Sequence, residues 1–131
     1  MKSFSVRTQN HTQFRDITQE IQSSLSDFGI KNGVVTVFVP HTTAGVTINE
    51  NADPDVTADI ADALEKAVPW QAAYSHSEGN AAAHVKASVM GSSVQIMVED
   101  GRLKLGTWQG VYFCEFDGPR TRKVWVQAVG L

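Results

Sequence analysis

Four strand-like runs in the second half of the chain constrain the fold more than any other feature of the sequence. They are HVKASVMG (84–91), SVQIMVEDG (93–101), VYFCEFDG (111–118) and RKVWVQAVG (122–130). Each run contains β-branched or aromatic residues and ends at a glycine, which permits the tight turns that reverse an antiparallel strand. The pattern therefore predicts a β meander from residue 84 onward.

The first half of the chain adds further strands. The segment SFSVRT (3–8) alternates loosely, as a first strand does. The run GVVTVFVP (33–40) consists of β-branched and aromatic residues bounded by glycine and proline, which predicts a strand covered on both faces. The segment AGVTINE (44–50) continues as the next strand.

Two segments have the residue spacing of amphipathic helices. One begins at Thr18, a predicted N-cap, and its apolar residues recur every three or four positions up to a stop at Gly29. The other begins at Asp53, a capping residue followed by proline, and ends before Pro69. Together these elements predict a single domain over residues 1–131. Its class is α+β, an antiparallel β-sandwich with two main helices packed outside.

Composition and charge exclude several functional classes. The chain has 131 residues, of which 42% are hydrophobic and 19% charged, as in an ordinary folded domain. The formal net charge of -3 leaves no basic surface for a phosphate backbone, so we expect no nucleic-acid partner. No stretch approaches the ~18 apolar residues of a membrane span, and no secretory leader is apparent, so we expect a cytoplasmic protein without a membrane partner.

Two histidine-containing segments are candidate sites. In PHTTAGVTINE (40–50), His41 follows a strong strand and is surrounded by small residues, while Glu50 stands at the end of the next strand. In HSEGNAAAH (76–84), four polar side chains fall among alanine, glycine and serine: His76, Glu78, Asn80 and His84. Imidazoles beside a carboxylate suit a zinc-like ion, but the spacing equally fits histidines of a solvated loop.

Two further segments could contact a ligand. In LGTWQG (105–110), glycines flank Thr107, Trp108 and Gln109, so a tight turn could offer backbone N–H groups and the Thr107 hydroxyl, with Trp108 as a wall; a plain structural turn is the alternative. In GPRTRKVW (118–125), Arg120 and Arg122 alternate along a predicted strand and could clamp a phosphate. The alternative there is a solvated strand start.

These motifs together resemble the YjbQ family of small bacterial and archaeal proteins. The resemblance is carried by VTVFVPHTTAGVTINENADPDV, EGNAAAHVKASVMGSSV and DGRLKLGTWQGVYFCEFDGPRTRKVWVQ, which span nearly the whole chain from residue 34. It implies a homotrimer and a metal site formed by His41, His76 and His84. Glu50, Glu78 and Asn80 lie in the same motifs as candidate catalytic residues, and residues 107–109 form the other signature.

The resemblance also implies an enzyme with thiamine-phosphate synthase activity, possessed as a main or a secondary function. Such a transferase joins hydroxymethylpyrimidine diphosphate to thiazole phosphate and releases pyrophosphate, and Arg120 or Arg122 would assist in binding phosphate. Three histidines suit zinc, whereas a diphosphate substrate usually brings magnesium. The alternatives are a metal-dependent hydrolase of a phosphorylated metabolite, with Glu78 or Glu50 as base, and a non-catalytic trimer that binds a metal or anion.

Overall fold

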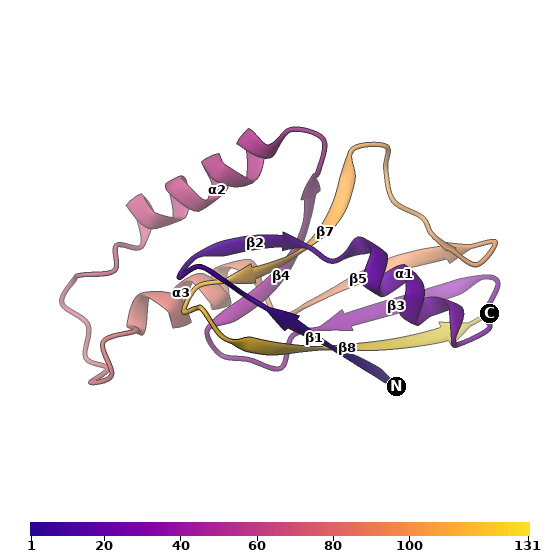
Figure 1. The fold of residues 1–131 in the computed structure, drawn as a ribbon, viewed down its shortest axis with the longest axis horizontal. Helices are drawn as coiled ribbons and strands as arrows, with labels where there is room; N and C mark the ends of the chain where they lie inside the picture. Colours follow the sequence, from indigo (N-terminus) through magenta and orange to yellow (C-terminus); the bar gives the residue numbers. More distant parts are fainter.

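A computed structural model describes residues 1–131, with eight strands and three helices (Figure 1). The strands are β1 (Lys2–Arg7), β2 (Gln13–Asp16), β3 (Gly33–Phe38), β4 (Ala44–Glu50), β5 (Ser93–Glu99), β6 (Arg102–Leu103), β7 (Gln109–Glu115) and β8 (Thr121–Gly130). The helices are α1 (Thr18–Ser26), α2 (Pro54–Ala67) and α3 (Ala81–Met90). None of the three helices is long and apolar enough to cross a membrane.

Two antiparallel sheets enclose the core, as the predicted α+β sandwich requires. The larger sheet has the order β1-β8-β3-β5-β6 and the smaller one β2-β7-β4. Alternating residues point inward from both sheets, among them Val35 and Val37 of β3 and Phe113 of β7, and α1 adds Ile21 and Leu25 to the same core. Burial of these apolar side chains is the main favourable contribution to folding.

Helix α3 replaces a predicted strand. The prediction of a strand over residues 84–91 is wrong, because the alanines at 81–83 favour a helix and its small side chains pack closely on β4. At Gly45 of β4 a Cβ would lie only 2.6 Å from the carbonyl oxygen of Gly91, so only glycine permits this approach. Val85 and Val89, which suggested a strand, lie exposed on the outer side of α3.

The helix boundaries follow the sequence in one case and not in the other. Asp53 caps α2 as predicted, since its side chain accepts a hydrogen bond from the backbone N–H of Asp55 at 2.9 Å. For α1 the predicted cap is wrong: Ile17 holds the N-cap position. Thr18 is the first helical residue, and its hydroxyl accepts a hydrogen bond from the Val111 N–H instead. Thr18 therefore ties α1 to β7.

The larger sheet leaves its outer face uncovered. Strand β3 alternates between buried and exposed side chains, so the prediction that both its faces are covered is wrong. Phe38 stacks on Trp125 of β8 with ring centroids 5.7 Å apart, and Val34 lies in register with Met97 and Val129. We call these five exposed apolar residues the outer sheet face. No helix of the chain packs there, because α1 lies on the inner core and α3 packs on β4.

A second, smaller core joins α3 to β7. It includes Ala83 and Ala87 of α3 with Tyr112 and Cys114 of β7. Cys114 is fully buried, and burial raises the pKa of its thiol, so it remains protonated and inert. Because this core fixes α3 against β7, it also fixes the polar residues at the start of α3.

Candidate functional site

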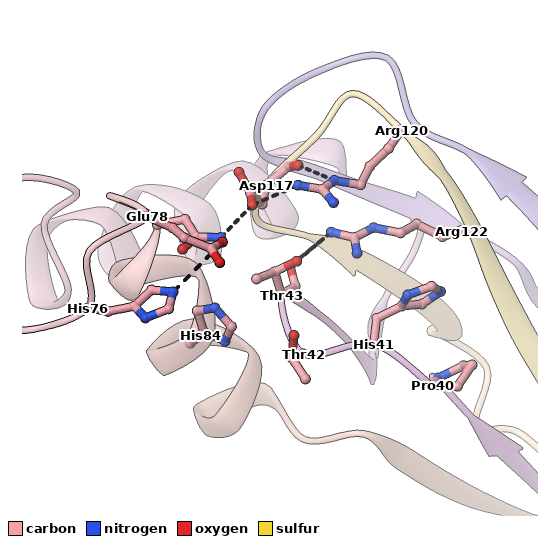
Figure 2. Close-up of a pocket in the computed structure, with 11 residues that line it drawn as sticks. Pro40, His41, Thr42, Thr43, His76, Glu78, His84, Asp117, Arg120 and Arg122 are labelled. Carbon is pink, nitrogen blue, oxygen red and sulfur yellow. Dashed lines mark hydrogen bonds and ion pairs between the residues drawn. The ribbon is translucent and has the colours of Figure 1, made fainter.

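A polar pocket opens where three separate segments meet at one end of the sheets (Figure 2). The loop between β3 and β4, the residues that lead into α3 and the connection from β7 into β8 contribute to its wall. Its volume is about 440 Å³, and none of its lining residues is hydrophobic. The lining residues are Pro40, His41, Thr42, Thr43, His76, Glu78, Asn80, His84, Asp117, Arg120 and Arg122. We call this cavity the charged pocket.

A buried ion pair supports the floor of the charged pocket. Arg122 donates from Nε to Glu115 Oε1 at 2.9 Å, and its Nη2 contacts Glu115 Oε2 and Thr43 Oγ1. Burial alone would raise the pKa of Glu115, but the hydrogen bonds from Arg122 and Thr8 outweigh it and hold this pKa below its usual value. Glu115 is therefore ionised at neutral pH. No hydrogen bond within the protein engages Arg122 Nη1, so this nitrogen can donate to a ligand.

Asp117 links two segments of the pocket wall, the connection from β7 into β8 and the start of α3. It accepts hydrogen bonds from Arg120 at both its carbonyl oxygen, at 2.8 Å, and its carboxylate, at 2.9 Å. The same carboxylate oxygen accepts from Asn80 Nδ2 at 3.0 Å, at the start of α3. Both side chains are thus held in one orientation by a single carboxylate. Asp117 was not among the predicted site residues, although it directly precedes the GPR motif.

Asn80 carries the one buried side-chain oxygen or nitrogen without a partner. Its Nδ2 donates to Asp117, which orients the amide, and its Oδ1 is buried with no hydrogen-bond donor from the protein. A buried acceptor left unpaired costs about 1–3 kcal/mol. A ligand or water that donates a hydrogen bond to Oδ1 would recover that energy, so the pocket offers an acceptor beside its two guanidinium groups.

His41 is held by the backbone of β8. Strand β3 ends at Phe38, so the N–H of Lys123 lies beyond the ladder and donates to His41 Nε2 at 2.9 Å. This bond places the imidazole proton on Nδ1. Burial, followed by the positive charge of Arg122, lowers the pKa of His41 below its usual value. His41 is therefore a neutral side chain at physiological pH.

The other two histidines lie together on the opposite wall. His84, in the first turn of α3, meets His76 edge to face with ring centroids 5.1 Å apart (Figure 2). His76 Nε2 lies 3.9 Å from Glu78 Oε2. A carboxylate at this distance can orient the imidazole. The pair could therefore hold or donate a proton at the cavity.

The structure does not fit a zinc ion held by His41, His76 and His84. All three rings line the charged pocket, but no group of three histidine, cysteine or acidic side chains is arranged to hold a metal ion. The Nε2 lone pair of His41 is already used by Lys123.

Four of the predicted site residues lie elsewhere in the chain. Glu50 is paired in register with Gln109, whereas the pocket end of the same ladder pairs Ala44 with Glu115. Six residues of β4 separate the two ends, which corresponds to ~20 Å. Thr107, Trp108, Gln109 and Glu50 therefore form a separate group, the far-end turn. None of these four residues lines the charged pocket.

Hydrogen bonds within the segment close the far-end turn. Gln109 Oε1 accepts from the Gly106 N–H at 2.8 Å, and the Trp108 carbonyl accepts from the Asn51 N–H at 2.9 Å. The Trp108 side chain is 62% exposed and covers no cavity wall. Within one chain, the segment 105–110 thus has the geometry of a closed structural turn.

His11 lies near the site although it stands outside every sequence motif. Its Nε2 is 3.9 Å from Asp117 Oδ1, and the indole of Trp70 meets the imidazole edge to face at 4.4 Å. The backbone carbonyl of His11 also accepts from the Gly118 N–H at 3.0 Å. No local pattern around residue 11 predicts these contacts, since they depend on how the turn between β1 and β2 meets the loop after β7.

The fold and the pocket define a small α+β protein of two antiparallel sheets with a polar cavity at one end. The chain belongs to the YjbQ family, since the family model described as UPF0047 protein YjbQ-like matches residues 2–131. It is 48% identical over 131 residues to the UPF0047 protein YugU of Bacillus subtilis, with 99% of each chain covered. It is 46% identical over 127 residues to the UPF0047 protein MJ1081 of Methanocaldococcus jannaschii, covering 97% of this chain and 92% of that protein.

Solved structures show the same fold. The crystal structure of an uncharacterized conserved protein of the YjbQ/UPF0047 family from Clostridium acetobutylicum has a TM-score of 0.97 and 56% sequence identity, covering 98% of this chain and 100% of the other. A hypothetical protein from Aeropyrum pernix K1 has a TM-score of 0.94 and 39% identity, covering 99% and 98%. These similarities establish the family and the fold.

Proposed function

We propose that the chain is an enzyme that binds a phosphorylated metabolite in the charged pocket, and that thiamine-phosphate synthesis is its reaction. The observation that carries this proposal is the pair of guanidinium groups at the pocket, each oriented by a carboxylate: Arg120 by Asp117 and Arg122 by Glu115. Fixed guanidinium groups bind phosphate oxygens with little loss of side-chain entropy. The resemblance to the YjbQ family supplies the particular reaction.

The charges of the pocket limit what can bind. Arg120 and Arg122 are offset by Glu115, Asp117 and Glu78, so the group is formally negative by one charge while the histidines are neutral. A diphosphate therefore needs further positive charge. A magnesium ion bound with the diphosphate would supply it, and so would a protonated histidine.

The chain's own residues can stabilise the departing pyrophosphate and protonate it. In the proposed reaction the thiazole nitrogen forms a bond to the pyrimidine methylene carbon while the carbon–oxygen bond breaks, and pyrophosphate leaves with the electron pair. Arg120 and Arg122 donate hydrogen bonds to its oxygens as their charge increases. His84, beside His76 and Glu78, can donate a proton to the leaving pyrophosphate.

A hydrolase is the second candidate, favoured by the His76–Glu78 pair. An imidazole 3.9 Å from a carboxylate can act as a general base toward water, and attack on a phosphate ester would then require no second substrate. The two candidates use the same side chains. They differ in whether a phosphate ester is consumed without the thiazole partner.

We also propose that the chain forms the homotrimer that the family resemblance implies. The outer sheet face supports association, because five apolar side chains lie exposed on three adjacent strands. An exposed apolar patch of this kind is typical of a protein interface. A Met97→Glu variant should lower the molar mass measured by light scattering, and an unchanged mass would exclude this face from the interface.

The test of the catalytic proposal is to assay thiamine phosphate formation by purified protein with both substrates, with and without magnesium. The parent should form product, while His84→Ala and Glu78→Ala should lose most of the activity and keep the thermal unfolding midpoint. Glu99→Ala, a carboxylate on β5 outside the pocket, is the matched control and should behave as the parent. Phosphate release without thiazole would favour the hydrolase, and no turnover of either kind would leave the non-catalytic anion-binding protein.

Metal content measured on the same preparations tests the three-histidine site. The parent and His84→Ala should contain equal, substoichiometric amounts of zinc, because the histidines are not arranged as a ligand set. One zinc ion per chain in the parent, lost in His84→Ala, would show that the rings rearrange around the ion.

A further inference from the structure

A second cavity of about 500 Å³ adjoins the charged pocket. The two share three lining residues: His41 and Thr42 from the loop after β3, and His84 from α3. In Figure 2 the His41 and His84 side chains stand on opposite walls, so the two cavities meet between these imidazoles. A ligand bound in one cavity can therefore extend past both rings into the other.

The two cavities differ in charge. The charged pocket is lined by Glu78, Asp117, Arg120 and Arg122, whereas the second cavity is lined by no acidic residue, lysine or arginine. Its remaining lining residues are Ala44, Ala87, Ser88, Gly91 and Ser92. We call this second cavity the neutral pocket.

The neutral pocket combines room with hydrogen-bonding groups. Alanine and glycine leave space for a flat group, while three hydroxyls, from Thr42, Ser88 and Ser92, can donate or accept hydrogen bonds. The Ser88 hydroxyl donates to the His84 carbonyl at 3.0 Å, so its oxygen remains free as an acceptor. Because no acidic residue, lysine or arginine lines this pocket, a charged group bound there would lack such a side chain as its partner.

We infer that the neutral pocket is the subsite for the uncharged heteroaromatic part of a substrate whose phosphate groups occupy the charged pocket. This inference rests on the proposed function and adds to it the position of the reacting bond. With the phosphate end in one cavity and the ring in the other, the bond between them lies beside His41 and His84. The site thus selects a substrate with a charged end and a neutral ring end.

Three probes, titrated calorimetrically into the parent protein in the presence of magnesium, test the inference. Inorganic pyrophosphate probes the charged pocket, and 4-amino-5-hydroxymethyl-2-methylpyrimidine, an uncharged heteroaromatic alcohol, probes the neutral pocket. The diphosphate of this alcohol probes both. We expect the diphosphate to bind at least about tenfold more tightly than either part, because one ligand then gains both sets of contacts.

Blocking variants locate the ring. Ser88→Trp and Ser92→Trp place a large side chain at two exposed positions of the neutral pocket, on α3 and just before β5. Each should raise the Kd of the alcohol and of its diphosphate by about tenfold or more, while the Kd of pyrophosphate changes by less than about twofold. Val89→Trp, which adds the same side chain to an exposed position of α3 outside the pocket, is the matched control. Thermal unfolding of all variants checks that each is folded.

The outcomes separate this inference from the proposed function. If pyrophosphate fails to bind the parent, the proposed phosphate site is wrong. The inference of a substrate that spans both pockets is then wrong as well, even if the alcohol still binds. If pyrophosphate binds but the diphosphate is no tighter, or if neither blocking variant weakens it, the neutral subsite is wrong while the phosphate site stands. Equal weakening by Val89→Trp would also overturn the inference.

Discussion

The two ends of the β4–β7 ladder carry the densest sequence motifs of the chain, yet the structure makes them opposite in character. At the pocket end, residues from three distant segments meet around the buried pair of Arg122 and Glu115, and donors and acceptors remain available. At the other end, the far-end turn is closed by its own hydrogen bonds, exposes Trp108 and lines neither the charged pocket nor the neutral pocket. A motif is thus a candidate site only where folding brings it to a cavity with residues of other segments.

The difference also concerns stability. The pocket end takes charged groups out of water, which is costly unless each finds a partner, whereas the far-end turn keeps its groups close to solvent. Substitutions at the pocket end should therefore affect both stability and binding. Substitutions at the far-end turn should affect at most local stability. The following experiments test this contrast, from the largest expected effect to the smallest.

Glu115→Ala should lower the free energy of unfolding by about 3–5 kcal/mol, because it leaves the Arg122 guanidinium buried without its counter-charge. Urea denaturation at pH 7.5 measures the loss. The double variant Glu115→Gln with Arg122→Met removes both charges and should recover a large part of it. A loss below about 1 kcal/mol would show that water reaches the guanidinium.

Arg120→Ala should weaken the binding of inorganic pyrophosphate by about tenfold, because one oriented, charged donor is lost. Calorimetry on the folded variant measures the Kd. Arg102→Ala removes an exposed arginine of β6 outside the pocket and is the control for net charge. Equal weakening by the control would mean that pyrophosphate responds to overall charge and not to the pocket.

His41 should make the pocket end sensitive to acid. Because the folded-state pKa of His41 lies below that of the unfolded chain, the unfolded state binds the proton more readily, and stability falls as the pH drops below about 6.5. Denaturation at pH 7.5 and 5.0 should show a larger loss for the parent than for His41→Gln, whose amide oxygen can still accept from Lys123. An equal loss in both would assign the pH dependence to other groups.

Gln109→Ala should lower stability by only about 0.5–1.5 kcal/mol, the net contribution of the hydrogen bond that closes the far-end turn. The Kd of pyrophosphate should be unchanged. A weakened Kd in this variant would contradict the separation of the two ends, and would mean that the turn reaches a pocket in another copy of the chain.

Glu50→Gln should have the smallest effect, within about 0.5 kcal/mol in stability and with unchanged enzymatic activity. The substitution keeps the shape of a side chain that lies at the far end of β4, and the contact of this residue with the Tyr112 hydroxyl uses its backbone carbonyl. Loss of product formation in the assay of the proposed reaction would restore Glu50 as a catalytic candidate.

Much of the fold was predictable because local patterns and tertiary structure agree. The strands over residues 93–99 and 121–130 and the capped helix α2 follow directly from alternation, glycine turns and the Asp53 cap. The strand predicted at 84–91 failed because its apolar spacing fits two geometries, and only the close contact between α3 and Gly45 selects the helix. The prediction that β3 is covered on both faces was wrong for a similar reason, because a run of apolar residues does not reveal which face of a strand will be covered.

The candidate site was predictable in its residue types and only partly in its membership. The two histidine segments and the two arginines of GPRTRKVW do meet at the charged pocket. Glu115 was hidden in a strand between Cys114 and Phe116, and Asp117 and His11 acquire their roles only through contacts across the chain. Glu50 and residues 107–109 stood in equally distinctive motifs but lie at the wrong end of the ladder.

By itself the sequence determined where most strands lie, the capped start of α2, the family, and which kinds of side chain could form a site. The strands and the cap depend on residues only a few positions apart in the chain. Tertiary structure alone decided which motifs meet. The antiparallel register of β4 on β7 places Ala44 beside Glu115 and Glu50 beside Gln109, so residues six positions apart in sequence belong to opposite ends of the ladder. The register of two strands that no short turn connects depends on which of their side chains pack together in the core, and that packing is set by the whole fold.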